Sequence, residues 1–404
     1  MSRAPSLRFE GFSGDWEQRK LGELAQFSKG TGYSKADLRE TGTPIILYGR
    51  LYTNYETVIS DVDTFADKKA GSVYSRGGEV IVPASGEAAE DISIASVVEK
   101  PGIILGGDLN IITPSPNLDS AFLAIRISNG KPHNDMAKMA QGKSVVHLHN
   151  TDLEQIDLIY PCYKEQVRIS SYFKHIDNLI TFHQQKYRKL VSTEKAMLLK
   201  LIPTKGYNTP ELRFEGFYNN WEWRKLSDML SPYSDPVPTP REGYERLGIR
   251  SYGKGTFYSF VEPGHELGTA QMHRVAADKL IVNITFAWEH AVAVTEESDA
   301  GKLVSHRFPQ FSLSEDLYPQ FLRYLILDER FRHHLLLASP GGAGRNRVLK
   351  VDEMLEYRVC VPEYREQKQI ADFLNSLEHL IQFHAMQIEK LKNIKAACLE
   401  GMFV

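Results

Sequence analysis

Basic side chains stand beside aromatic side chains at several places in the second half of the sequence. In nucleic-acid-binding proteins, cations contact phosphates while aromatic and hydrogen-bonding groups contact the bases. Each residue taken alone could equally be a surface charge or a core aromatic, so the hypothesis of a DNA contact depends on the set. The candidates are Arg250, Tyr252, Lys254, Trp288, Arg345 and Arg347.

The first half has a comparable cationic loop, QGKSVVHLHN, in which Lys143, Ser144 and His147 are candidate DNA contacts. The letters GKS resemble the end of a phosphate-binding P-loop. That motif needs an earlier glycine, however, and position 137 is Ala. No apolar strand precedes the loop either, so we expect contact with DNA phosphates and not nucleotide binding.

Other reactive side chains do not form a site that the sequence can support. Glu87, Glu90 and Asp91 lie close together in the polar segment 83–93, but no histidine or further ligand accompanies them. We therefore expect a solvated loop there, without acid–base or metal chemistry. Cys162, Cys360 and Cys398 lack the spacing of a zinc site or a disulfide framework and are expected to be reduced thiols.

The elements that must position the candidates are duplicated. Residues 5–24, PSLRFEGFSGDWEQRKLGEL, recur 205 residues later as PELRFEGFYNNWEWRKLSDM. A repeat of this length indicates two domain-sized halves and not a solenoid. We assign Arg8, Arg19 and Lys20 of this segment, with their second-half counterparts, to packing before DNA contact.

Each half ends in a long helical segment. No glycine or proline occurs between Pro161 and Pro203, and apolar residues recur at heptad spacing, which predicts one long helix with an apolar stripe. A second such stripe follows 201 residues later, so we expect the two helices to pair antiparallel about a pseudo-twofold axis. The stripe residues are Ile169, Phe173, Ile176, Ile180, His183 and Leu190, then Ile370, Leu374, Leu377, Ile381, His384 and Leu391.

Polar residues recur at matching places in the two stripes. His183 aligns with His384, and Glu194 aligns with Lys395. Such polar positions commonly set the register of paired helices at some cost in stability. A metal or catalytic role for the two histidines is disfavoured because no carboxylate or cysteine cluster accompanies them.

The composition is that of a globular protein of 404 residues, with 42% hydrophobic residues and a net charge of −3. This charge means that a DNA-binding surface must be a local patch, with partners supplying much of the phosphate neutralisation. The sequence contains no long uncharged apolar stretch of the kind that predicts a membrane span, so we expect a cytoplasmic protein. Short β-branched runs such as Val80 to Val82 and Leu280 to Val282 predict strands, and segment 231–241, with four prolines, is expected to be an extended loop.

The two openings RFxGFxxxWExRKL, the helix starts P-x-Y-[KR]-E-Q-x-x-I and the order domain, helix, domain, helix resemble the specificity subunit of type I restriction-modification enzymes along the whole chain. The resemblance implies an α+β fold with two mixed α/β target-recognition domains, separated by two long helices that pack as an antiparallel coiled coil with internal pseudo-twofold symmetry. The expected boundaries are 1–160 and 205–361 for the domains, and 161–204 and 362–404 for the helices.

The resemblance also implies partners. Each domain would read one half of a bipartite site in double-stranded DNA, and the helices would set the gap and bind two methyltransferase subunits. S-adenosylmethionine, ATP and Mg²⁺ would be used by the methyltransferase and restriction subunits, with no cofactor in this chain. No methyltransferase motif, complete P-loop or nuclease cluster is present in the sequence, which fits a non-catalytic reading subunit.

Two other classes of function remain open from the sequence. A coiled-coil adaptor with two domains that bind ligands other than DNA would show the same duplication, and co-purification with a methyltransferase would distinguish it. A self-contained methyltransferase-nuclease is disfavoured by the length and by the missing motifs, and S-adenosylmethionine binding by the purified chain would favour it again.

Overall fold

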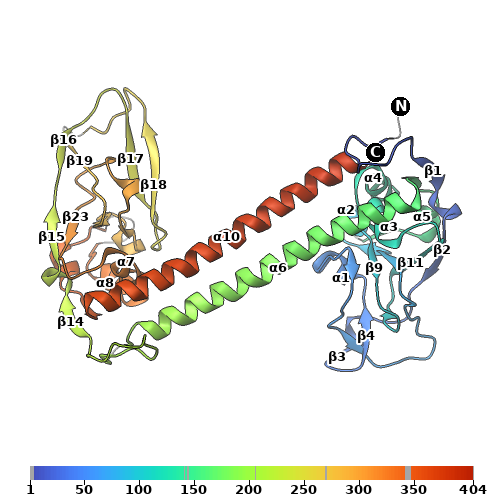
Figure 1. The fold of residues 1–404 in the computed structure, drawn as a ribbon, viewed down its shortest axis with the longest axis horizontal. Coiled ribbons are helices and arrows are strands. Elements are labelled where there is room, and N and C mark those ends of the chain that lie inside the picture. The colour runs from blue at the N-terminus through green and yellow to red at the C-terminus, as the bar shows by residue number, and fades with distance from the viewer. Residues whose placement is uncertain are drawn as a thin grey trace. The chain divides into compact units, whose positions relative to one another are not determined.

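The computed structural model describes residues 4–140, 142, 145–204, 206–268, 271–341 and 347–403, which fall into two compact units (Figure 1). The first unit comprises Met1–Lys186 and His384–Val404, and the second comprises Tyr187–Phe383. Each unit is therefore completed by part of a long helix from the other half of the sequence. The domain boundaries expected from the sequence remain predictions.

The first unit is built on a five-stranded sheet of order β2-β11-β7-β9-β5. A four-stranded sheet, β10-β4-β6-β3, and the pairs β1-β13 and β12-β8 complete its strands. The strands are β1 (Glu17–Lys20), β2 (Ala25–Lys29), β3 (Leu38–Arg39), β4 (Thr43–Ile46), β5 (Val58–Ile59), β6 (Phe65–Ala66), β7 (Glu79–Pro83), β8 (Ser85–Gly86), β9 (Ser96–Val98), β10 (Ile104–Leu105), β11 (Leu109–Pro114), β12 (Val146–His147) and β13 (Asp157–Tyr160). The short helices are α1 (Gly49–Thr53), α2 (Ala89–Ile92), α3 (Ser120–Ile127), α4 (Gly130–Met139) and α5 (Asn150–Glu154).

The second unit has a four-stranded sheet, β15-β23-β20-β21, a five-stranded sheet, β16-β19-β22-β17-β18, and the pair β14-β24. The strands are β14 (Glu222–Lys225), β15 (Leu230–Tyr233), β16 (Pro236–Pro238), β17 (Tyr244–Ile249), β18 (Thr256–Val261), β19 (Gln271–Arg274), β20 (Lys279–Val282), β21 (Val292–Val294), β22 (Leu303–Val304), β23 (Gln310–Leu313) and β24 (Arg358–Val361). The short helices are α7 (Pro319–Ile326), α8 (Glu329–Leu337) and α9 (Val351–Leu355).

Each unit has a core of its own, built around one strand that is buried on both faces. β7 and β20 carry the predicted β-branched runs, and each pairs antiparallel on both sides, with β11 and β9 or with β23 and β21. The repeated tryptophans, Trp16 and Trp221, are each 2% exposed. Their rings make edge contacts with Phe122 and Phe321, at centroid distances of 6.1 and 5.9 Å. The duplicated opening segment therefore anchors equivalent cores.

The proline-rich segment 231–241 is not simply a loop, which corrects the expectation from the sequence. Residues 230–233 form β15 and 236–238 form β16. Each strand pairs with a single neighbour, β15 with β23 and β16 with β19. Proline lacks a backbone N–H and is tolerated in edge strands of this kind.

The two long helices are present as predicted, α6 over Tyr163–Leu201 and α10 over Tyr364–Met402, with 39 residues each. In the first unit Tyr172 Oη lies 3.4 Å from Cys398 Sγ, and Asp177 pairs with Lys395 at 2.5 Å. A forward step along α6 is thus matched by a backward step along α10, so the helices pair antiparallel.

The stripe residues differ in burial along each helix. Ile169, Phe173, Ile176, Ile370, Leu374 and Leu377 are buried, whereas Ile180, His183, Leu190, Ile381, His384 and Leu391 are half-buried. The buried ones lie near the start of each helix, where the sheet domain of the same unit covers them.

A buried ion pair joins the opening segment to the helix start in each unit. The Arg8 guanidinium donates through Nε and Nη2 to both carboxylate oxygens of Glu165, each at 2.7 Å. Arg213 makes the same two bonds with Glu366, at 2.8 Å. Glu165 and Glu366 are 1% and 0% exposed, so each carboxylate depends on its arginine. The two repeated sequence motifs therefore bind each other, and Arg8 serves packing as expected.

The glutamine after each glutamate bridges the same helix start to the domain. Gln166 Nε2 donates to the Pro161 carbonyl at 2.9 Å, and its Oε1 accepts the Asp119 N–H at 2.8 Å. Gln367 makes the equivalent bonds with the Pro362 carbonyl and the Tyr318 N–H, both at 2.9 Å. The E-Q pair of the helix-start motif thus joins each long helix to the sheet domain of its unit.

Candidate nucleic-acid interface

Two loops meet in the same way in each unit, and the candidate residues lie on or beside them. One loop follows the central strand, β7 or β20, and the other precedes α5 or α9. The Leu148 N–H donates to the Ala84 carbonyl at 3.0 Å, and the Leu349 N–H donates to the Ile284 carbonyl at 2.8 Å. The duplication therefore extends to the loops, although their side chains differ.

In the second unit, this loop pair brings two candidates together. Trp288 lies in a 3-10 helix, η4 (Ala287–Glu289), and its Nε1 donates to the Thr285 carbonyl at 3.2 Å. The Arg347 guanidinium lies 5.7 Å from the centroid of the Trp288 ring, a cation–π distance. A half-buried ring with a cation on its face is suited to a surface that contacts both bases and phosphates.

The turn between β17 and β18 carries Arg250, Tyr252 and Lys254 and lies beside η4. The Tyr252 N–H donates to the Glu289 carbonyl at 2.8 Å, so the turn is bonded to the tryptophan segment. Lys254 Nζ lies 5.8 Å from the centroid of the exposed Tyr252 ring. Arg250 instead lies over Phe257, at 5.3 Å, and donates to the Thr256 carbonyl, so part of its hydrogen-bonding capacity serves its own hairpin.

The first unit places His147 on β12, which pairs with β8. His147 is exposed, and its ring stacks against that of His149 at a centroid distance of 6.4 Å. The other candidates of these loops, Lys143, Ser144 and Arg345, lie outside the described residues.

The segment 83–93 is more structured than the solvated loop that the sequence predicts. It contains β8 and the short helix α2, and Ser85 and Ile92 are buried. The polar composition is misleading because the apolar side of this segment packs under the carboxylates, while Glu87, Glu90 and Asp91 themselves are exposed. Glu87 and Asp91 lie near Tyr52, whose pKa is raised by burial and by these charges together with Tyr48.

Sequence reasoning missed a row of exposed aromatic side chains next to the Tyr252 turn. Phe257, Tyr258 and Phe260 lie on β18, the edge strand of its sheet, and are 39%, 43% and 58% exposed. The run TFYSFV was the signal that could have found them. Its aromatic residues do not alternate with polar residues, as they would in a strand with one buried face. Tyr258 Oη donates to Asp299 at 2.9 Å and so is already oriented by the protein.

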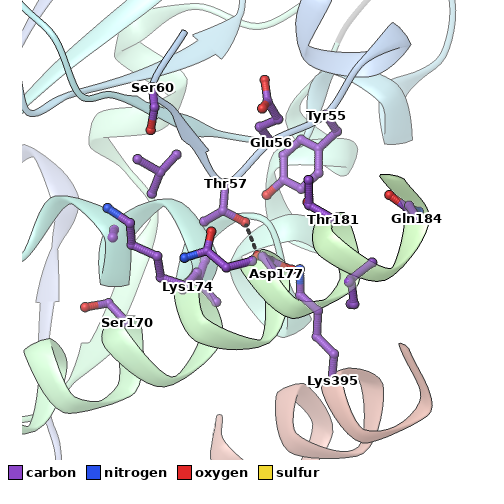
Figure 2. Close-up of a pocket in the computed structure, with 15 residues that line it drawn as sticks. Tyr55, Glu56, Thr57, Ser60, Ser170, Lys174, Asp177, Thr181, Gln184 and Lys395 are labelled. Carbon is purple, nitrogen blue, oxygen red and sulfur yellow. Dashed lines mark hydrogen bonds and ion pairs between the residues drawn. The ribbon is translucent and has the colours of Figure 1, made fainter. Parts of the chain in front are cut away.

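A groove of about 250 Å³ lies between residues 55–60 and α6 in the first unit (Figure 2). Its cations are paired: Lys395 with Asp177 at 2.5 Å, and Lys174 with Glu99 at 2.6 Å. Thr57 Oγ1 donates to the same Asp177 carboxylate at 3.3 Å. Because these charges neutralise one another, the groove fastens the sheet domain to the helix and is a poor anion site.

Within the described ranges, no cluster of three or more His, Cys, Asp or Glu side chains is placed to hold a metal ion. None of the helices in these ranges has the length and apolarity of a membrane span. The candidate surface is therefore assigned on its cations and aromatic rings alone.

Comparison with known proteins gives one consistent result. Residues 13–191 match the model of the type I restriction modification DNA specificity domain. The chain is 21% identical over 399 residues to the type I restriction enzyme MjaVIII specificity subunit of Methanocaldococcus jannaschii, covering 94% of this chain and 90% of that protein. Its fold is similar to the crystal structure of the S subunit of a type I restriction-modification system from M. genitalium, with a TM-score of 0.60, 12% identity and 99% of each chain covered.

Proposed function

Because this chain belongs to the family of type I restriction-modification specificity subunits, we propose that each of its sheet domains reads one half of a bipartite DNA sequence. The observation that carries this proposal is the duplicated loop pair. The bonds Leu148 to Ala84 and Leu349 to Ile284 repeat, whereas the side chains around them do not. A conserved frame with different contact residues is what two different half-sites require.

In this proposal the recognition domains span 1–160 and 205–361, and the helical segments span 161–204 and 362–404. His147, Arg250, Tyr252, Lys254, Trp288 and Arg347, with Lys143, Ser144 and Arg345, are the proposed DNA contacts. The stripe residues of α6 and α10 hold the helices together, and the length of the helices sets the gap between half-sites.

The chain is a non-catalytic member of a larger complex. Two methyltransferase subunits and the restriction subunits act with it on double-stranded DNA. They use S-adenosylmethionine, ATP and Mg²⁺, whereas this chain uses no cofactor. We place the complex in the cytoplasm, where its DNA is.

The outer faces of the long helices support docking of two like subunits. Phe182 on α6 and its counterpart Phe383 on α10, 201 residues later, are 49% and 46% exposed although each belongs to a paired helix. Large exposed apolar side chains on an ordered helix indicate a contact surface for another protein. Equivalent surfaces on the two helices would accept two copies of the same methyltransferase.

The test is an exchange of residues 30–140 for those of another member, followed by mapping of methylated adenines in the DNA of cells that carry the complex. We expect one half-site to change and the other half-site, with the gap, to stay. If both half-sites changed, the assignment of one half-site to each domain would be wrong. An unmodified chain that neither co-purifies with a methyltransferase nor directs methylation would favour the adaptor function instead.

A further inference from the structure

The turn that joins β17 to β18 has an unusual residue at its tip. The Arg250 N–H donates to the Gly255 carbonyl at 2.9 Å and closes the hairpin. Tyr252 and Gly253 both have φ of 63°. Two consecutive residues of positive φ are typical of a type I′ turn, in which Asn-Gly is the preferred pair. A bulky tyrosine at the asparagine position is strained, because its Cβ crowds the backbone in the left-handed region.

A second left-handed residue holds this turn in place. His290 also has φ of 63°, and it is only 3% exposed. Its carbonyl accepts the Gly253 N–H at 3.0 Å, while the preceding Glu289 carbonyl accepts the Tyr252 N–H. Ser251 Oγ donates to the Glu289 carboxylate at 2.6 Å. The strained conformation is therefore fixed by hydrogen bonds from three residues of the turn to residues 289 and 290.

The His290 ring anchors residues 289 and 290 to the core of the second unit. Its Nε2 lies 2.6 Å from the Ile326 carbonyl oxygen, so Nε2 must carry the proton and donate it. Gly253 packs closely against Leu327, because a Cβ at that position would lie 2.5 Å from Leu327 Cδ2, and the His290 ring is within van der Waals contact of the same point, at 3.7 Å. The turn cannot move without breaking these contacts.

The strain is not offset by burial of the tyrosine itself. The Tyr252 side chain is 63% exposed, and Lys254 of the same turn lies over its ring. Strained backbone that stabilises no core is concentrated at binding and catalytic sites, where the surrounding structure holds a group in the orientation that a ligand needs. Tyr252 satisfies this description, and the ring of Trp288 lies on the segment that braces it.

We propose that Tyr252 determines the base preference of the second unit and that His290 is the positioning residue that holds it. This proposal rests on the proposed function. The ring of Tyr252 contacts a base edge or a thymine methyl group in the major groove, and its hydroxyl hydrogen-bonds to a base. Lys254, on the same turn, contacts phosphate and so adds affinity without base preference.

The first test is Tyr252→Asn in the complete complex, since asparagine is the residue that this turn favours. We expect the melting temperature to stay the same or rise, because strain is removed. Methylation at the half-site assigned to the second unit should fall about ten-fold or more, since one base contact discriminates by roughly that factor. Tyr218→Asn is the matched control, since Tyr218 is 84% exposed in the same unit and has no such backbone.

An unchanged methylation pattern in Tyr252→Asn would overturn the proposal, and so would a marked loss of stability, because Tyr252 would then be a structural residue. The proposed function fails in a different way, namely if the unmodified complex methylates no bipartite site. Lys254→Gln should weaken DNA binding about equally for all sequences.

The second test addresses His290. His290→Ala should broaden the base preference at the second half-site while the first half-site stays unchanged. His290→Asn, which tolerates the left-handed region and retains a donor, should restore part of the preference. Equal loss at both half-sites in His290→Ala would mean a general folding defect and would overturn the positioning role.

Discussion

His183 Nδ1 lies 2.8 Å from His384 Nδ1, and the two residues occupy equivalent places, 201 positions apart, in the apolar stripes of α6 and α10. A nitrogen–nitrogen hydrogen bond needs one imidazole to donate and the other to accept, so the two rings cannot both be protonated and keep it. Desolvation, followed by the charges of His183 and Lys186, lowers the pKa of His384. Here the polar break in the stripe is a pair of imidazoles that contact each other across the two helices.

The histidine pair predicts a loss of stability in acid. Because the pKa of His384 is lower in the folded than in the unfolded chain, its contribution is present above the unfolded pKa of about 6.5 and is lost as pH falls below it. Between pH 7.5 and pH 5.5 the melting temperature should fall more for the natural chain than for His183→Leu/His384→Leu, by on the order of 1–3 °C. Thermal melts followed by circular dichroism measure this, and equal slopes would refute the role of the pair.

The buried ion pair of the opening segment predicts a large effect from one substitution. Arg8→Met leaves the Glu165 carboxylate, 1% exposed, without its bidentate partner. Loss of one member of such a pair costs roughly 3–5 kcal/mol in the free energy of unfolding. Urea denaturation followed by tryptophan fluorescence should show the difference.

Two further variants separate the buried charge from other causes. Arg19→Met should change the free energy of unfolding by less than about 0.5 kcal/mol. The Arg19 side chain is 54% exposed, and its Nε lies as far as 3.9 Å from Glu17 Oε2, so this ion pair is weak. The double change Arg8→Met/Glu165→Met should be less harmful than Arg8→Met alone. A double variant that is worse than the single one would show that the pair matters for more than charge compensation.

Glu194 predicts a stabilising substitution. It corresponds to Lys395, but it lies near Glu378, and burial followed by the charge of Glu378 raises its pKa. Arg323, which pairs with Glu378, opposes this effect only in part. The contribution of the protonated carboxyl is therefore present below the unfolded pKa of about 4.3 and is lost as pH rises through the folded pKa.

At pH 7, Glu194→Gln should raise the melting temperature by roughly 1–3 °C, because a neutral amide replaces a poorly solvated charge. At pH 4 the two proteins should melt alike. Glu389→Gln, at an exposed position of α10, is the control and should have little effect at either pH. A gain that persisted at pH 4 would show that the cause is not the charge of Glu194.

The features that the sequence predicted well are those with a period or a repeat. The heptad spacing predicted the two long helices, α6 and α10. The repeated RFEGF opening predicted two equivalent frames. These signals depend on local patterns and on comparison of the chain with itself, so no knowledge of distant contacts was needed.

The features that the sequence could not predict depend on contacts between distant segments. Nothing in the letters of the helix start shows that Glu165 binds Arg8, 157 residues away. The composition of segment 231–241 indicated a loop because its strand partners, β19 and β23, could not be foreseen. The left-handed conformation of Tyr252 is held by carbonyls of residues 289 and 290, which no local rule connects to the turn.

The length of the two long helices is expected to set the gap between the half-sites. One heptad can be removed from each helix by deleting residues 184–190 and 377–383. Because each deletion removes one complete repeat, the heptad register of both stripes is kept. Seven helical residues span roughly 10.5 Å, which corresponds to about three base pairs of DNA at 3.4 Å each. In the complete complex, mapped methylation sites should therefore retain both half-sites with a gap shortened by about three base pairs.

A matched variant in which the same residues are all replaced by alanine, except the stripe positions, keeps the length and should keep the gap. If the shortened chain still directs methylation with the original gap, the helices do not set the spacing.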